Sequence, residues 1–299
     1  MDDGQARAYL ESLRWPDGPI CPHCGADRPY RLNPKPGSKT RKGVLKCRSC
    51  RKQFTVTVGT IFEDSHIPLH KWLMAIHLLC ASKKGMSAHQ LHRMLGIAYK
   101  SAWFMAHRIR YAMQQEPLKS KLIGVVEADE TFIGGKPRAG QIRSKSDARR
   151  WADRKAPVVS LVQRDGDVRS FHVERVTEAN LRKVLTENVE PEARLMTDGR
   201  GAYRSIGRQF PSHEKVDHSL GEYVRGDVTT NTVEGYFGLL KRGLNGTYHH
   251  VGQQHLHRYL SEFDFRWNRR RVEDGLRAAL AIKGFEGKRL TFEPLTGRD

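Results

Sequence analysis

Four residues in the second half of the chain have types and spacings that suit chemistry at a phosphodiester bond: Asp129, Asp198, Glu234 and Lys241. Asp198 and Glu234 stand 36 positions apart, and Lys241 follows the glutamate by seven. Two aspartates at strand ends and a glutamate on a helix can hold two divalent metals about 3.5 to 4 Å apart, which supports in-line displacement at phosphorus. The pattern therefore predicts a metal-dependent enzyme that cuts and joins DNA.

Glu234 lies in the segment Asn231-Thr232-Val233-Glu234-Gly235-Tyr236-Phe237-Gly238-Leu239-Leu240-Lys241-Arg242, which we expect to be helical. Positions 231, 234, 238 and 241 fall along one face of such a helix. Lys241 would then point its ammonium group at a phosphate next to the cleaved bond, where it positions the substrate.

Two other residues are alternative catalytic candidates. Glu127 lies two positions before Asp129, on the same face of the expected strand, so it competes for a metal. Asn231 is a neutral oxygen donor one helical turn before Glu234, which it could supplement or replace. Capping of the helix is the structural alternative for Asn231.

Four cysteines form two Cys-x-x-Cys pairs with 22 residues between them, close to the spacing that wraps tetrahedral zinc. The expected zinc ligands are Cys21, Cys24, Cys47 and Cys50. Disulfides and a redox dithiol are the alternatives. An intracellular setting disfavours the first, and the presence of two pairs disfavours the second. We therefore expect a small zinc ribbon with structural Zn²⁺.

Charge indicates the kind of partner. Lys and Arg outnumber Asp and Glu by 52 to 33, for a formal net charge of +19, which favours a polyanion over a merely basic surface. The N-terminus is acidic and lacks an apolar core segment, so we expect a cytoplasmic protein. The most apolar stretch, 72–81, has about half the length that spans a bilayer, so no membrane role is expected.

The region between the cysteines and the acidic residues has a helix-turn-helix pattern. Pro68 opens one helix, Ser87 caps a second, Gly96 makes a turn, and a third helix carries Ala102 and Met105 along one side. The third helix would present basic and polar residues to a major groove, although a plain three-helix bundle without DNA contact has the same pattern. The candidate DNA contacts on this helix are Lys100, Ser101, Arg108 and Arg110.

From Leu122 onward the pattern alternates between strands and helices. A buried strand over 122–130 is expected to end near Asp129, strands over 158–163 and 170–176 pair across a turn at 164–167, and a helix covers 178–188. A further strand over 193–197 ends at Asp198. A three-stranded meander followed by a crossover is the order of an RNase H-like mixed α/β core.

These patterns divide an α+β multidomain chain into four parts. We expect an N-terminal helix and zinc ribbon at 1–62, a helix-turn-helix DNA-binding region at 63–117, a catalytic domain at 118–275 and a tail at 276–299. A basic loop at 136–156 is either a DNA contact or a solvated linker. Its candidate DNA contacts are Arg149 and Arg150.

The order of these parts resembles the bacterial insertion-sequence DDE transposases of family 1595. The resemblance rests on Glu127-Ala128-Asp129-Glu130-Thr131-Phe132-Ile133-Gly134-Gly135-Lys136, on Thr197-Asp198-Gly199 and on Asn231-Thr232-Val233-Glu234-Gly235, and it covers roughly 15–275. It implies an acidic triad of Asp129, Asp198 and Glu234 that works with Mg²⁺ (or Mn²⁺), trailed by Lys241. Some relatives use asparagine for the last glutamate, which keeps Asn231 as an alternative. Relatives often carry histidine where this chain has Thr229.

The resemblance also implies a reaction and its partners. Water attack would free 3′ hydroxyls at the element ends, and those hydroxyls would then attack target DNA. The ribbon and helix-turn-helix would bind the terminal inverted repeats, and pairing of two ends implies a homo-oligomer on DNA. Two other functions remain open: a catalytically inactive DNA-binding regulator, and a metal-dependent nuclease without strand transfer.

Overall fold

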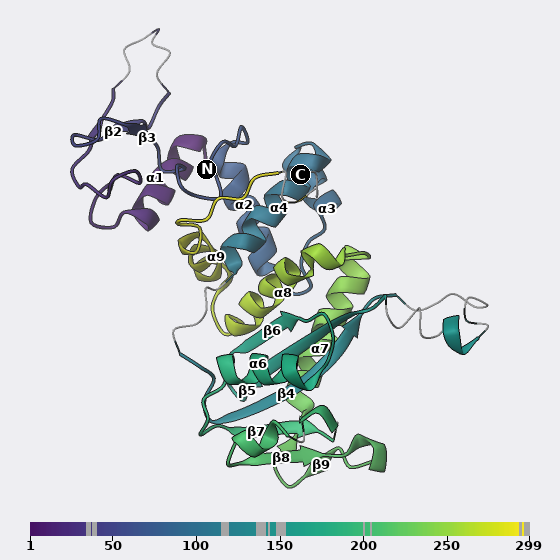
Figure 1. Ribbon diagram of the computed structural model, residues 1–299. Helices are drawn as coiled ribbons and strands as arrows, with labels where there is room; N and C mark the ends of the chain where they lie inside the picture. Colours follow the sequence, from purple (N-terminus) through teal and green to yellow (C-terminus); the bar gives the residue numbers. More distant parts are fainter. Residues whose placement is uncertain are drawn as a thin grey trace. The chain divides into compact units, whose positions relative to one another are not determined.

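The computed structural model describes residues 1–33, 37, 41–114, 120–135, 142, 144–147, 154–199, 201–203, 205–292 and 295. The chain forms two compact units, coloured along the sequence in Figure 1. The first comprises Met1–Gln115 and Arg271–Asp299, and the second comprises Glu116–Arg270. Both ends of the chain therefore belong to one unit, and the second unit is an insertion within it.

The first unit opens with a helix and a small ribbon. α1 (Asp3–Arg14) begins with a capping box, in which the Asp2 side chain accepts from the Gln5 N–H and the Gln5 side chain accepts from the Asp2 N–H. The ribbon is an antiparallel sheet of two-residue strands, in the order β1 (Tyr30–Arg31), β2 (Leu45–Lys46) and β3 (Gln53–Phe54). Strands this short bury little apolar surface, so the ribbon depends on another source of stability.

Three helices follow, where the sequence pattern places them: α2 (Leu69–Ala81), α3 (Ala88–Leu95) and α4 (Tyr99–Met113). The Ser87 side chain accepts from the Gln90 N–H at the start of α3. Gly96 ends α3 with φ +58, a left-handed conformation that glycine adopts without a Cβ penalty. The buried residues of α2 and α4 include Trp72, Met105 and Ile109, which lie on the faces that the helical spacing indicates.

The segment 276–299 is not a simple tail. It begins inside α9 (Asp274–Lys283), which packs against α2 in the first unit. Beyond α9, Phe285 is buried and meets Phe62 with ring centroids 5.2 Å apart. The expectation of a tail failed because helical spacing in a short segment does not reveal that a core lies at the other end of the chain.

The second unit contains a five-stranded mixed sheet in the order β6-β5-β4-β7-β8. β4, β5 and β6 form an antiparallel meander, and α6 then crosses over so that β7 runs parallel to β4 and β8 parallel to β7. This is the RNase H-like core that the sequence predicts. The elements are β4 (Val125–Ile133), β5 (Ala156–Gln163), β6 (Val168–His172), α6 (Glu178–Asn188), β7 (Arg194–Asp198) and β8 (His213–Val216).

The central strand β4 does not end at Asp129, as the sequence suggested, but continues to Ile133. β5 pairs with it over this whole length, from Val126↔Gln163 to Ile133↔Ala156. The parallel ladder with β7 stops earlier, at Ala128↔Thr197. Asp129 is therefore the first β4 residue beyond the β7 ladder, although it lies inside the strand.

Helices cover both faces of the sheet. On one face, Leu181 and Leu185 of α6 share a buried cluster with Val126 and Ala128 of β4. On the other face, α7 (Asn231–Gly243) and α8 (Gln253–Asn268) bury apolar side chains against Val158 of β5. α7 therefore packs directly over the strands that carry the predicted site.

Shorter elements complete the second unit: η1 (Gly201–Tyr203), η2 (Gly207–Gln209), η3 (His218–Leu220), β9 (Val224–Arg225), β10 (Val228–Thr229) and the π-helical turn η4 (Leu244–Tyr248). Within the described parts of both units, no helix combines the length and the apolar character that crossing a membrane requires.

Candidate zinc and carboxylate sites

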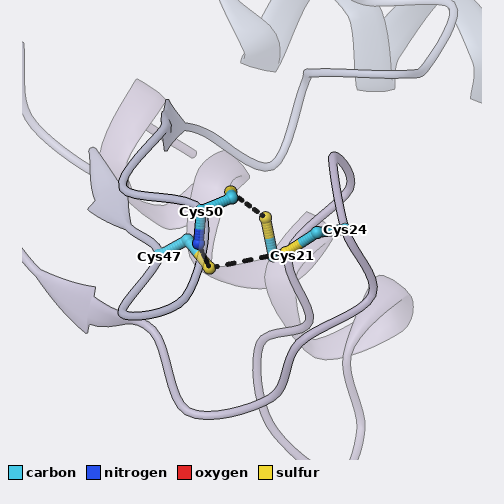
Figure 2. A group of neighbouring side chains, drawn as sticks. All are labelled: Cys21, Cys24, Cys47 and Cys50. Atoms are coloured by element: carbon cyan, nitrogen blue, oxygen red, sulfur yellow. Dashed lines mark hydrogen bonds between the residues drawn. The ribbon is translucent and has the colours of Figure 1, made fainter.

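The four cysteines converge between two knuckles (Figure 2). Cys21 Sγ lies 3.7 Å from Cys50 Sγ, and Cys24 Sγ lies 3.6 Å from Cys47 Sγ. Sulfurs at about 2.3 Å from a tetrahedral zinc are about 3.8 Å apart, so these distances fit one Zn²⁺ held by all four thiolates.

The backbone shapes both knuckles in the same way. The residue after each second cysteine has positive φ, +72° at Gly25 and +61° at Arg51. The N–H of Cys50 donates to Cys47 Sγ at 3.4 Å, and this bond is the main reason that the pKa of Cys47 falls to about 6. A lowered thiol pKa favours the thiolate, which is the form that binds zinc.

Three carboxylates gather where β4 leaves the β7 ladder. Oxygen atoms of Asp129, Glu130 and Asp198 all lie within 4.8 Å of one another. Asp198 is the last residue of β7, in register just beyond the Ala128↔Thr197 pair, which explains why the two aspartates meet. Glu130 comes from the other face of β4, where it accepts a hydrogen bond from the Tyr203 hydroxyl at 2.8 Å.

The carboxylates perturb one another. Burial, followed by the charge of Glu130, raises the pKa of Asp129 to about 7, and the charges of Asp198 and Glu234 add to the effect. A hydrogen bond from the Glu130 N–H to Asp129 Oδ1, 2.7 Å long, opposes it. Hard oxygen donors that repel one another in this way fit a divalent cation such as Mg²⁺, which would neutralise the repulsion.

Glu234 lies near this group, but of the described carboxylates it is not among the three that share the 4.8 Å limit. Its side chain is 43% exposed. Thr230 Oγ1 donates to Glu234 Oε1 at 2.9 Å, and His218 Nε2 lies 3.6 Å from the same oxygen. The His218 ring in turn stacks on Tyr223, with centroids 5.0 Å apart. Glu234 thus lies at the edge of the carboxylate group, next to its partners Thr230 and His218.

Lys241 and Asn231 lie on the same helix as Glu234, and both are exposed. Asn231 is the first residue of α7, whereas the cap position is Thr230, so helix capping does not account for Asn231. The exposed ammonium of Lys241 lies about two turns further along α7 and is accessible to a polyanion.

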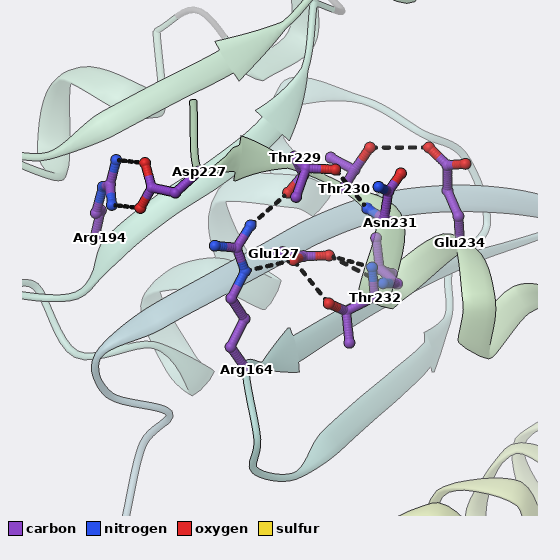
Figure 3. Close-up of polar contacts among 10 residues, drawn as sticks. Glu127, Arg164, Arg194, Asp227, Thr229, Thr230, Asn231, Thr232 and Glu234 are labelled. Carbon is purple, nitrogen blue, oxygen red and sulfur yellow. Dashed lines mark hydrogen bonds and ion pairs between the residues drawn. The ribbon is translucent and has the colours of Figure 1, made fainter. Parts of the chain in front are cut away.

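Glu127 has a different role from the metal ligand that was its alternative assignment (Figure 3). It is fully buried, and its two oxygens accept hydrogen bonds from Arg164, Thr232 and Val233. These donors lie on the turn after β5 and at the start of α7. An oxygen engaged in this way does not face a metal, so the structure contradicts Glu127 as a ligand.

The predicted DNA contacts of the helix-turn-helix region differ in their exposure. Lys100 is exposed and Ser101 is partly exposed, as a groove-facing position requires. Arg108 and Arg110 are buried, and the prediction that they face DNA is wrong. The Arg108 guanidinium donates to the backbone carbonyls of Leu290, Ile61 and Glu63. Arg149 and Arg150, predicted contacts in the basic loop, lie outside the described residues.

A cavity of about 470 Å³ lies beyond the C-terminal end of α7 in the second unit. Its walls include Arg154, Lys155, His249 and His250. Gln253 Nε2 donates to the Arg154 carbonyl at 3.0 Å and joins α8 to the start of β5. Arg154 and Lys155 bring positive charge to the wall of this cavity, which suits a phosphate group.

Sequence reasoning missed two residues of the site. Strand alternation puts the Glu130 side chain on the opposite face of β4 from Asp129, so the sequence does not predict that their carboxylate oxygens lie within 4.8 Å of each other. His218 is the first residue of the three-residue helix η3, which is too short to show a periodic pattern. Its sole sequence signal is its place between Asp198 and Glu234.

Two family models match the chain. The ISXO2-like transposase domain matches residues 121–268, and the transposase zinc-ribbon domain matches residues 1–53. The chain is also 29% identical over 276 residues to an uncharacterized protein in transposable element ISH50 of Halobacterium salinarum, which covers 89% of this chain and 91% of that protein. The two models, one for the zinc ribbon and one for the catalytic domain, together with this relative support membership of the chain in the IS1595 family of transposases.

Proposed function

We propose that this protein binds the terminal inverted repeats of an insertion sequence and catalyses metal-dependent DNA cleavage and strand transfer. The observation that carries the proposal is the meeting of Asp129 and Asp198 at the end of the β4–β7 ladder, beneath the helix that bears Glu234. Family membership makes the protein a transposase, and this geometry supports DNA cleavage by carboxylate-bound metals.

In this proposal Asp129 and Asp198 hold the metal ions, and the third ligand is Glu234 or Glu130. Bound Mg²⁺ or Mn²⁺ would activate the attacking water or the 3′ hydroxyl of the DNA and stabilise the leaving oxygen. Glu234 is exposed and its charge adds to the raised pKa of Asp129, so in this proposal its side chain rotates from Thr230 toward the metal ions. Glu130 is more constrained, since Tyr203 holds one of its oxygens.

In this proposal, exposed and partly exposed polar and basic side chains supply the contacts to DNA. Lys241 lies about two turns along α7 from Glu234, and Lys155 lines the cavity beyond the end of α7, so both would contact the phosphate backbone. In the first unit, Lys100 and Ser101 at the start of α4 would reach base edges or phosphates of the repeats. Because two element ends must be joined to one target, the active form would be a homo-oligomer on DNA, working at the nucleoid.

A nuclease without strand transfer would use the same carboxylates, so the test must separate cleavage from joining. Purified protein is incubated with Mg²⁺, a labelled element end and supercoiled target, and both nicked and joined products are measured. We expect both products from the wild type, and repeat binding without either product from Asp198→Asn. Cleavage without joining would favour the nuclease, and repeat binding without cleavage by the wild type would favour the regulator.

Comparison of two further variants assigns the third ligand. Glu234→Gln is expected to lower cleavage at least 100-fold if Glu234 is the ligand, while Glu130→Gln would then have the smaller effect. The reverse order would assign the role to Glu130. Asn231→Ala tests in the same assay whether Asn231 supplements or replaces Glu234.

A further inference from the structure

Glu127 is a buried carboxylate in the middle of β4, two residues before Asp129 on the same strand face. Burying an ionised carboxylate is costly unless hydrogen bonds and an opposite charge compensate it. Glu127 has both. Arg164 Nε donates to Glu127 Oε1 at 2.7 Å, and the Thr232 hydroxyl donates to the same oxygen at 2.9 Å.

The second oxygen of Glu127 binds the start of α7. The Thr232 and Val233 N–H groups donate to Oε2 at 2.8 and 3.1 Å. The first N–H groups of any helix lack partners within the helix. In the described structure, the cap residue Thr230 makes no side-chain bond to them. Glu127 thus caps α7 from a strand more than 100 positions earlier in the chain, and its charge lies at the positive end of the helix dipole.

Arg164 extends this contact to the residues that precede the helix. Its Nη2 donates to the Thr229 carbonyl at 3.1 Å while its Nε holds Glu127 (Figure 3). Thr229 belongs to β10, and Thr230, which follows it, donates to Glu234. One carboxylate and one guanidinium therefore fix both the start of α7 and the approach to it.

Each element joined by Glu127 carries a residue of the carboxylate site. β4 carries Asp129 two positions further on, and α7 carries Glu234 immediately after Val233. We propose that Glu127 is a positioning residue, which sets the distance between Asp129 and Glu234 by anchoring the N-terminus of α7 to β4. This inference rests on the proposed function for its catalytic consequence, but the anchoring itself is a separate physical claim.

The test compares two buried glutamates. In Glu127→Gln, an amide NH₂ replaces one acceptor oxygen and faces the hydrogen-bond donors that this oxygen bound. Glu262→Gln is the matched control, because Glu262 is equally buried in the second unit, accepts from the Tyr248 hydroxyl and pairs with Arg266, but lies on α8 away from the start of α7. Loss of outer-sphere partners typically costs 10- to 100-fold in metal affinity or activity.

The first measurement is hydrogen exchange of the Thr232 and Val233 amides, which needs no activity. We expect at least tenfold faster exchange in Glu127→Gln and unchanged exchange there in Glu262→Gln. The second is the Mg²⁺ dependence of element-end cleavage. The Mg²⁺ concentration for half-maximal cleavage should rise about tenfold in Glu127→Gln alone, even if the melting temperatures of both variants fall by the same amount.

Equal exchange rates at these two amides in Glu127→Gln and wild type would overturn the anchoring. Faster exchange with an unchanged Mg²⁺ dependence of cleavage would overturn the positioning of Glu234. If Glu127→Gln does not fold, Thr232→Val removes only the hydroxyl contact and should shift both measurements in the same direction by a smaller amount. If the wild type cleaves nothing, the proposed function fails, while the exchange measurement still decides the anchoring.

Discussion

The crowded carboxylates should destabilise the metal-free protein, and Asp129→Asn should relieve that cost. The folded protein raises the pKa of Asp129 from its ordinary 3.8 to about 7. At about 1.4 kcal/mol for each pKa unit, the ionised side chain costs the folded state as much as roughly 4 kcal/mol. Asp129 is partly exposed, so solvent screening reduces this, and we expect about 2 kcal/mol.

The sign of the effect follows from proton binding. Between pH 4 and 7 the folded state binds the Asp129 proton more tightly than the unfolded state does, so the free energy of unfolding falls as pH rises and levels off above pH 7. The neutral amide of Asp129→Asn avoids this loss, and its oxygen can still accept from the Glu130 N–H. The variant should therefore be more stable than the wild type at pH 8, and the gain should shrink toward pH 4.

The assay is urea unfolding without added divalent ions, with zinc left bound, from pH 5 to 8. The control is Glu192→Gln, which removes an exposed carboxylate before β7. This variant should show no pH-dependent gain in the free energy of unfolding. Added Mg²⁺ at pH 8 should stabilise the wild type and leave Asp129→Asn unchanged. If Asp129→Asn is no more stable than the wild type at pH 8, burial and the neighbouring carboxylates do not penalise the ionised Asp129 as described.

Four further predictions concern zinc, DNA binding and stability. Cys47→Ser should lower the bound zinc, measured by release to a chromogenic chelator, from one ion per chain to none, and the ribbon should lose protection from proteolysis. Lys100→Ala should lower the salt slope of repeat binding by about 1, measured by titration at several salt concentrations. By contrast, Arg108→Ala should lower the free energy of unfolding by about 3 kcal/mol or more, because two buried carbonyls and one partly buried carbonyl lose their donor. Lys155→Ala should weaken the binding of an element end to the protein about 3- to 10-fold without changing the free energy of unfolding. Lys183→Ala on α6 should leave this binding unchanged.

Much of the architecture could be predicted because local signals carried it. The cysteine spacing, the Ser87 cap and the turn at 164–167 each define their own element, and the meander followed by a crossover leaves few topologies. The aspartates were found for the same reason, since each lies near the end of a strand ladder. These signals act within a few residues of the feature that they specify.

The errors arose where a distant segment decides the outcome. Arg108 lies beside the apolar face of α4, and nothing near it in the sequence indicates that Leu290 and Ile61 supply its partners. Glu127 was an alternative candidate for a metal ligand because strand alternation gives its face but not its neighbours. Its partner Thr232 comes from a helix that only the tertiary fold brings close.

The return of the chain to its first unit determines what a shortened product would contain. α9 and Phe285 complete a core begun by α2 and Phe62, so ribosomes must translate the entire catalytic insertion before that core can close. A premature stop codon late in the reading frame would thus spare the carboxylates yet leave the amino-terminal helices incomplete. Gene decay from the 3′ side would therefore leave an amino-terminal fragment that cannot complete its own core.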